Sequence, residues 1–245
     1  MSQSSGSSVG DDERELLLRG LERIGIPQKA EDGNTAALQR ERAEALLGFL
    51  RELRLWNKRI SLVAEEGTDL VRRHVLDSLA PLPLLRELGG LGECADIGSG
   101  NGFPALPLLL CEHGMRITMI ERSGRKAGFL RNAAALPGTG GRAEVMQEDA
   151  VVTARRGRSF PLVISRAFLP FSKAFPILDG LRRQPDGCVV YYGGRRKVLE
   201  AELSKLEPEE RRRCSIVPVE VPFLDEERHL VIVRVSSPVR PASSF

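Results

Sequence analysis

The stretch DIGSGNG, residues 96–102, lies between a short apolar run at 93–97 and a second one at 106–111. The first run has the length of a buried strand, and the second indicates a short helix. Glycines in such a connection allow positive φ angles and let a ligand approach the backbone closely. Doubly wound α/β sheets bind their ligands at this place, beyond the carboxyl end of a strand. The stretch therefore predicts a ligand-binding loop, with a plain tight turn as the alternative.

Downstream of this loop, apolar runs of strand length alternate with segments of helical periodicity. Strands are expected at 116–121, 143–147, 162–165 and 188–192, and helices at 125–136, 171–181 and 197–206. Two final strands of alternating pattern, at 216–221 and 229–235, are expected to form an antiparallel hairpin at one edge. Strands that alternate with helices imply a parallel sheet covered on both faces. The predicted fold class is α/β, a Rossmann-like, doubly wound and mostly parallel sheet.

Upstream of the loop, apolar residues recur at helical spacing and no strand is indicated. One stripe comprises Leu16, Leu17, Leu21 and Ile24, and a second comprises Leu46, Leu47, Leu50, Leu53 and Leu55. A further helix is expected at 68–85. We therefore expect a disordered tail at 1–12, an N-terminal helical cap at 13–90, the sheet domain at 91–236 and a C-terminal tail at 237–245.

The composition fits one large domain with an extension. Of the 245 residues, 42% are hydrophobic, which supports a well-developed core and excludes a wholly disordered chain. No apolar run approaches the roughly 18 residues of a membrane span, and the N-terminal segment lacks the pattern of a signal peptide. We expect a cytoplasmic monomer without a membrane partner.

The four cysteines are widely scattered and form no CxxC pair. They are Cys94, Cys111, Cys188 and Cys214. This spacing favours buried free thiols in a reducing cytosol over a disulfide or a metal site.

Basic residues concentrate in one part of the chain. Residues 151–213 contain 14 Lys and Arg against 7 Asp and Glu, a local excess of 14 − 7 = +7, whereas the whole chain carries only +3. Such an excess is typical of a surface that binds a polyanion such as nucleic acid. Solvated loops and helix ends are the alternative.

An acidic residue stands at the end of each of the first three predicted strands. Asp96 precedes the glycines, Glu121 follows 121 − 96 = 25 residues later, and Glu148 and Asp149 follow the third strand. The spacing G-x-G-x-G differs from the G-x-G-x-x-G of dinucleotide-binding loops, which disfavours an NAD(P) oxidoreductase. A carboxylate at Glu121 can accept hydrogen bonds from both hydroxyls of a ribose, although a solvated strand end is the alternative. The pattern is typical of a domain that binds S-adenosyl-L-methionine (SAM).

Six motifs occur in a fixed order along the chain. They are WNKRI at 56–60, RHVLDS at 73–78, DIGSGNGFP at 96–104, ERSGRKAGFL at 121–130, SRA at 165–167 and ERHLV at 227–231. In these motifs the chain resembles the bacterial small-subunit ribosomal RNA guanine-N7 methyltransferase family, also called glucose-inhibited division protein B. RHVLDS, GFP and SRA are the most specific parts of the resemblance.

The resemblance implies an activity, a cofactor and a partner. It implies methylation of N7 of one guanine in the 530 hairpin of 16S rRNA, in the small ribosomal subunit, with SAM as the methyl donor. Family contacts to the cofactor fall on Gly98, Phe103, Ala150, Val151 and Arg166. Asp96, Gly100 and Glu121 join this set because they lie in the glycine loop or at the end of a neighbouring strand.

The implied chemistry makes few demands on the protein. Guanine N7 carries an in-plane lone pair, so no general base is required, and catalysis can rest on alignment of the reacting atoms. The O6 and N7 acceptors of guanine are best recognised by Arg or Lys donors. We therefore predict that Arg166 is the catalytic residue and orients the guanine edge beside the cofactor.

Three further residues are candidates for contact with RNA. His74 either faces the site together with Asp77 or is a helix-face residue hydrogen-bonded to Asp77 at i+3. Arg195 and Arg196 follow Gly193, which occupies the position of a lysine in the family pattern. We expect these two arginines to replace that lysine.

Departures from the family pattern at Val63, Ala105 and Gly193 keep two alternative functions open. One is a SAM-dependent methyltransferase that acts on another RNA or on a small molecule. The other is a SAM- and rRNA-binding protein that has lost turnover. Trp56, the single tryptophan, is expected to anchor the cap to the sheet, with a base-stacking platform as the alternative.

Overall fold

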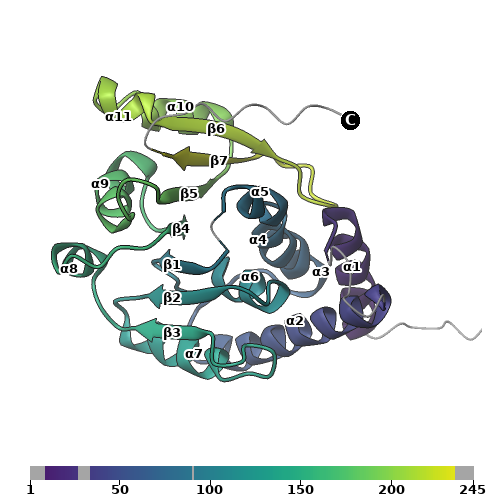
Figure 1. Cartoon of the computed structure of the whole chain (residues 1–245). Coiled ribbons are helices and arrows are strands. Elements are labelled where there is room, and N and C mark those ends of the chain that lie inside the picture. The colour runs from purple at the N-terminus through teal and green to yellow at the C-terminus, as the bar shows by residue number, and fades with distance from the viewer. Residues whose placement is uncertain (1–8, 27–33, 90, 235–245) are drawn as a thin grey trace, which may run out of the picture.

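The computed structural model describes residues 9–26, 34–89 and 91–234. In this part of the chain, seven strands form one sheet in the order β3-β2-β1-β4-β5-β7-β6 (Figure 1). They are β1 (Glu93–Ile97), β2 (Arg116–Ile120), β3 (Ala143–Met146), β4 (Leu162–Arg166), β5 (Cys188–Gly193), β6 (Cys214–Val219) and β7 (Arg228–Val233). The first five strands run parallel, and β7 is antiparallel to both β5 and β6. The predicted doubly wound sheet with an antiparallel edge is confirmed.

Helices cover both faces of the sheet (Figure 1). On one face lie α1 (Val9–Ile24), α2 (Thr35–Asn57), α3 (Gly67–Leu70), η1 (Val71–Leu76), α4 (Asp77–Leu79), α5 (Leu82–Glu87), α6 (Ala105–Cys111) and α7 (Gly124–Ala134). On the other face lie α8 (Ala150–Arg155), α9 (Phe171–Leu181) and α10 (Arg196–Leu203), and α11 (Pro208–Arg212) precedes β6.

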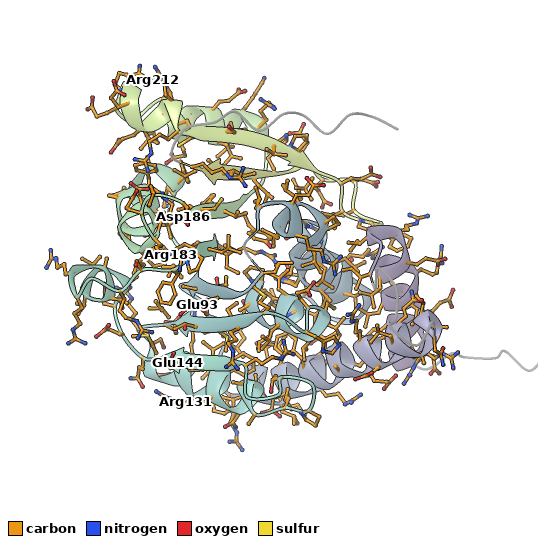
Figure 2. All side chains as sticks on the ribbon, viewed as in Figure 1. Glu93, Arg131, Glu144, Arg183, Asp186 and Arg212 are labelled. Atoms are coloured by element: carbon orange, nitrogen blue, oxygen red, sulfur yellow. The ribbon has the colours of Figure 1, made fainter. Side chains whose placement is uncertain are left out.

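The central strands are apolar throughout because both of their faces are buried. Successive side chains of a strand point to opposite faces. Accordingly Cys94 joins the apolar cluster beneath the N-terminal helices, whereas Ala95 joins the cluster beneath α8–α10. Figure 2 shows side chains filling the space on both sides of the sheet. Two cores therefore fix the sheet and leave its carboxyl edge to the loops.

The N-terminal helices share one apolar cluster with the sheet. Trp56 at the end of α2 packs edge-on against Phe129 of α7, with ring centroids 6.0 Å apart, and donates its indole N–H to Glu52. This confirms the anchor role of Trp56. Leu55, by contrast, is 59% exposed, so its assignment to the buried stripe was wrong. It lies two residues after the buried Leu53, and that spacing places it on another side of the helix.

The first helix begins at Val9, inside the segment expected to be a disordered tail. Asp11 and Asp12 stand in its first turn, where acidic side chains interact favourably with the helix dipole. Residues 1–8 and 235–245, which include the rest of that tail and the predicted C-terminal tail, lie outside the described residues.

The single helix expected at 68–85 is instead four short elements, α3, η1, α4 and α5. Residues 71–76 form a π-helix, a rare geometry that is frequent at functional sites. The helix breaks before α5, where Pro81 and Pro83 lack the N–H donors that would continue it. The apolar residues of this segment nevertheless face the core as their spacing predicts.

The sequence pattern also missed α8 and α11, which are only six and five residues long. The four cysteines are free thiols, of which Cys214 is half-buried and the others are buried. None of the described helices has both the length and the apolarity needed to cross a bilayer.

Candidate functional site

The loop after β1 is shaped by three glycines with positive φ. Gly98, Gly100 and Gly102 have φ angles of +73°, +49° and +83°, a region that other residues rarely adopt. The N–H of Gly98 donates to the carbonyl of Ile120 at 2.9 Å, which ties the loop to the end of β2. A Cβ on Gly98 would lie only 2.5 Å from the ring of Phe168. Glycine is thus required here both by the backbone and by its neighbour.

Glu121 connects this loop to the next helix. One carboxylate oxygen accepts from the Gly100 N–H at 3.0 Å, and the other accepts from the Ser123 N–H at 2.7 Å, at the start of α7. The residue is buried, and it lies directly after β2. Because a carboxylate oxygen can accept more than one hydrogen bond, both oxygens retain capacity for a ligand.

A cavity of about 360 Å³ opens beside this carboxylate. We call it the glycine-loop cavity. Its lining includes four of the residues proposed from the sequence as cofactor contacts, which are Gly98, Glu121, Ala150 and Val151. The lining also includes Lys126, Asp149 and Phe168, and the sequence analysis missed the first and last of these. The cavity lies at the carboxyl ends of β1, β2 and β3, and its volume is typical of small-molecule sites, roughly 300–1,000 Å³.

Asp96 lies next to the loop but does not line the cavity. Its side chain is buried, and neither carboxyl oxygen has a hydrogen-bond partner among the described residues. Burial raises the pKa of Asp96 from 3.8 to about 7. A buried carboxyl group without a partner favours its neutral form, since burial penalises the charge.

Three further predicted cofactor contacts, Gly100, Phe103 and Arg166, are also absent from the lining of this cavity. Gly100 is buried and holds Glu121 through its backbone. Phe103 packs between the rings of Phe49 and His74, with centroids 5.2 and 5.0 Å away. These contacts place Gly100 and Phe103 in support of the loop.

A second cavity, of about 280 Å³, lies on the other side of Ala167. Ala167 lines both cavities and is a non-glycine residue with a φ of +53°. We call this second space the arginine cavity. Its lining comprises Asp77, Pro81, Arg166, Ala167, Tyr191, Tyr192, Gly193, Gly194, Val219, Arg228, His229 and Leu230. The positive φ of Ala167 is a form of backbone strain, and such strain concentrates at functional sites.

Arg166 lines the arginine cavity and not the glycine-loop cavity. Its guanidinium forms an ion pair with Asp77 at 3.2 Å and donates to the carbonyl of Arg73 at 2.8 Å. Further donations reach the carbonyl of His74 and the hydroxyl of Ser78, each at 3.4 Å. The side chain therefore fixes the 73–78 segment to the end of β4.

His74 belongs to this network rather than to the surface of either cavity. Its Nδ1 lies 3.3 Å from a guanidinium nitrogen of Arg166, which is always a donor, so Nδ1 accepts and Nε2–H donates to Glu65 at 2.9 Å. Burial, and secondarily the charge of Arg166, lowers the pKa of His74. Of the two alternatives for His74, the one with a hydrogen bond to Asp77 was wrong, because the Asp77 carboxylate pairs with Arg166 and Arg228 instead.

The second of these arginines is Arg228, which the sequence analysis missed. Its Nε donates to Asp77 at 2.9 Å, and its Nη1 donates to the carbonyl of Glu227 at 3.1 Å. The ERHLV motif contained it, but only the antiparallel return of β7 brings its first residue to the carboxyl ends of β4 and β5.

Arg195 and Arg196 are exposed at the start of α10. The side chain of Arg196 pairs with Glu200 at 3.3 Å. Gly193 lies in the wall of the arginine cavity, and a Cβ there would approach Leu199 to 2.7 Å. The lysine of the family pattern thus has no room unless Leu199 moves.

Val63 departs from the family pattern without loss of its local contacts. Its N–H and carbonyl both bond the side chain of Asn57, at 3.1 and 2.9 Å. Since these contacts use the backbone, they do not depend on the side chain at 63. Across the described residues, no group of three His, Cys, Asp or Glu side chains is placed to hold a metal ion.

Comparisons with known proteins agree with this geometry. The profile of the family described as GidB, rRNA small subunit methyltransferase G, matches residues 42–231. The chain is 33% identical to ribosomal RNA small subunit methyltransferase G of Alkalilimnicola ehrlichii over 91% of this chain and 93% of the relative. It is 34% identical to the protein of the same name from Treponema pallidum, over 79% of this chain and 85% of the relative.

Among solved structures, a methyltransferase from Geobacter sulfurreducens is similar with a TM-score of 0.51 and 14% identity, over 79% of this chain and 89% of that one. At this identity the similarity concerns the fold, a Rossmann-like methyltransferase sheet. The sequence match extends over most of the chain and includes the glycine loop, Glu121 and the arginine cavity. The chain belongs to the rRNA small subunit methyltransferase G family.

Proposed function

We propose that this protein transfers the methyl group of SAM to N7 of a guanine in the 530 hairpin of 16S rRNA. The observation that carries the proposal is the pair of cavities that meet at Ala167. One cavity offers a carboxylate at the end of β2 for the donor, and the other offers guanidinium groups for an electron-rich acceptor. A transfer reaction needs two such sites side by side.

The residues of the glycine-loop cavity fit SAM. Glu121 has free acceptor capacity for the two ribose hydroxyls, and Ala150 and Val151 offer short side chains beside the end of β3. Lys126 and Asp149 contribute charges of both signs to the wall. Asp96, Gly100 and Phe103 would act from behind, by shaping the loop that holds the donor.

The chain has little proton transfer to perform. SAM supplies a methyl group on a positively charged sulfur, and the N7 lone pair forms the new bond while the pair of the broken carbon–sulfur bond remains on sulfur. The positive charge passes to the guanine, and no proton moves. The protein contributes alignment and the exclusion of water. Arg166 is assigned to the acceptor side, as a residue that positions the cavity wall against the 73–78 segment.

Contact with the RNA backbone is assigned to basic side chains at the rim. Arg195 and Arg196 are exposed and directly follow Gly193 and Gly194, two wall residues of the arginine cavity. Phosphate contacts of this kind give affinity and make binding sensitive to salt. With ribosomal RNA as substrate, we propose that the protein acts in the cytoplasm, as a monomer.

The test is methyl transfer from SAM with a labelled methyl group. Small ribosomal subunits and extracted 16S rRNA are treated separately, digested, and searched for the labelled nucleotide. We expect 7-methylguanosine from the 530 hairpin. Label in another nucleotide would show that a different position is the substrate. SAM binding without any label would favour an rRNA-binding protein that has lost turnover.

A further inference from the structure

The two arginines of the arginine cavity are not equivalent. Both Nη atoms of Arg166 are occupied, by Asp77, by two backbone carbonyls, by Ser78 and by the ring of His74. These contacts engage both Nη groups from within the protein, and only the single Nε–H has no hydrogen-bond partner among the described residues. Arg166 therefore has little donor capacity left for a substrate.

Arg228 is held from one side only. Its Nε is fixed by Asp77 and its Nη1 by a backbone carbonyl, whereas Nη2 has no hydrogen-bond partner among the described residues. The side chain is 23% exposed, and Nη2 is not among the buried unpaired atoms, so it remains accessible. The arrangement is an arginine fixed at two nitrogens with one free N–H pair, on a side chain that lines both the arginine cavity and a neighbouring pocket beside Glu226 and Glu227.

We propose that the arginine cavity holds the target guanine, and that Arg228 recognises its O6 atom. This inference rests on the proposed function and extends it to the acceptor. Guanine O6 and N7 are the two acceptors of one base edge. N7 must keep its lone pair free for the methyl group, so the guanidinium is directed at O6. N7 then faces Ala167 and the glycine-loop cavity beyond it.

Asp77 is the positioning residue in this arrangement. Its carboxylate is buried between the two guanidinium groups and offsets one of their two charges. This matters because the methylated guanine becomes a cation, and two uncompensated arginines would repel it. The same carboxylate fixes Arg228 through Nε and, since the Glu227 carbonyl holds Nη1, Nη2 remains free.

The entrance of the cavity has the features that a base extruded from RNA requires. Gly193 and Gly194 form part of the wall without side chains, and no atom lies within 4 Å of a Cβ built on Gly194. The exposed Arg195 follows at once in the chain and can meet a phosphate. Enzymes that act on a base take it out of its stack into a pocket of this kind.

The experiment compares Arg228→Ala with the wild-type protein and with Arg72→Ala as a matched control. Arg72 is a partly exposed arginine that, among the described residues, forms an ion pair with Asp69 alone. We expect kcat/KM for small subunits to fall about 10- to 100-fold in Arg228→Ala, as for loss of one hydrogen bond from a charged donor. SAM affinity, measured by calorimetry, is expected to stay within about twofold in both variants. An unchanged kcat/KM, or an equal loss of SAM binding, would overturn the assignment.

A second measurement does not depend on how much of the variant is folded. The same protein preparation is given 16S rRNA with guanine or with adenine at the target position, since adenine keeps N7 but replaces O6 by an amino group. We expect the wild-type preference for guanine to shrink about tenfold or more in Arg228→Ala, within the range of one base contact. A preference equal to that of the wild type contradicts the role of Arg228. If the wild-type protein methylates neither RNA, the proposed function itself fails.

Discussion

A buried aspartate lies in or beside each of the two cavities, and the two differ in their hydrogen-bond and ion-pair partners. In the arginine cavity, Asp77 is held by Arg166 and Arg228 at 3.2 and 2.9 Å. Beside the glycine loop, Asp96 is also buried, and its two carboxyl oxygens have no hydrogen-bond partner among the described residues. Burial of a charge is costly unless the charge is paired. The Asp77 carboxylate is paired with two guanidinium groups, whereas Asp96, without such a partner, favours its neutral form.

The difference follows from where each cavity obtains its polar groups. The glycine-loop cavity is built from the ends of neighbouring parallel strands, and two backbone N–H groups hold its functional carboxylate, Glu121. The arginine cavity joins elements far apart in the chain, and long cationic side chains span them. The first is therefore a local, backbone-made site, and the second depends on side-chain electrostatics.

Removal of the Asp77 carboxylate tests this contrast most severely. We expect Asp77→Ala to lower the free energy of unfolding by about 3–5 kcal/mol, because two partly buried guanidinium groups lose their counter-charge. Urea unfolding at neutral pH measures it. Asp69→Ala, which removes an exposed partner of Arg72, is the control and is expected to change stability by less than about 0.5 kcal/mol. A loss below about 1 kcal/mol in Asp77→Ala would show that the network is not a structural element.

Asp96 is tested through the pH dependence of the free energy of unfolding. Its pKa is raised to about 7 by burial, so between pH 4 and 7 the folded state binds a proton that the unfolded state has released. The contribution of Asp96 to the free energy of unfolding is therefore most favourable at low pH. It falls as the pH rises, by up to about 1.4 kcal/mol per pH unit. Asp96→Asn removes this pH dependence. The free energy of unfolding of the variant, relative to that of the wild type, should therefore increase from pH 4 to pH 7 and stay constant above pH 7.

Unfolding curves of both proteins across this range measure the effect. Asp149→Asn is a suitable control, because Asp149 is half-buried and caps α8 through a hydrogen bond to the Val151 N–H. A difference between Asp96→Asn and the wild type that does not change with pH would mean that Asp96 is ionised in the folded protein.

The sequence predicted the residues of the glycine-loop cavity far better than those of the arginine cavity. The strand-end argument predicted the glycine loop and Glu121, because parallel strands end at the same edge, and the family resemblance supplied Ala150 and Val151. Arg228 lies at the start of an antiparallel strand that returns to β5. Its place depends on a long-range register that no local pattern encodes.

The RHVLDS segment shows a second limit. The spacing of Val71, Val75, Leu76 and Leu79 correctly predicted which side faces the core. It did not predict the π-helix at 71–76, which changes the number of residues per turn and so the direction of His74. The alternative in which His74 bonds Asp77 was wrong, although both residues do belong to one network through Arg166.

Glu121→Gln sharpens the contrast on the side of the glycine loop. The amide keeps one acceptor oxygen but presents N–H groups toward the Gly100 or Ser123 N–H. We expect SAM affinity to fall about 10- to 100-fold, as for one or two weakened charge-assisted hydrogen bonds. Calorimetry is the measurement, with Glu144→Gln on the exposed side of β3 as control. Unchanged SAM affinity would remove Glu121 from the ribose site.

The smallest effect is expected from His74, whose ring connects Glu65 to Arg166 behind the arginine cavity. The hydrogen bond from His74 lowers the pKa of Glu65, while burial lowers that of His74, so the pair is a neutral imidazole that donates to a carboxylate. A double-mutant cycle of His74→Ala and Glu65→Ala should give a coupling of about 0.5–1.5 kcal/mol in the free energy of unfolding. Because His74 is neutral, the coupling should be the same at pH 7 and pH 8. A coupling that falls by half between those pH values would mean that the imidazole is protonated, and the donor to Glu65 would then be an imidazolium repelled by Arg166.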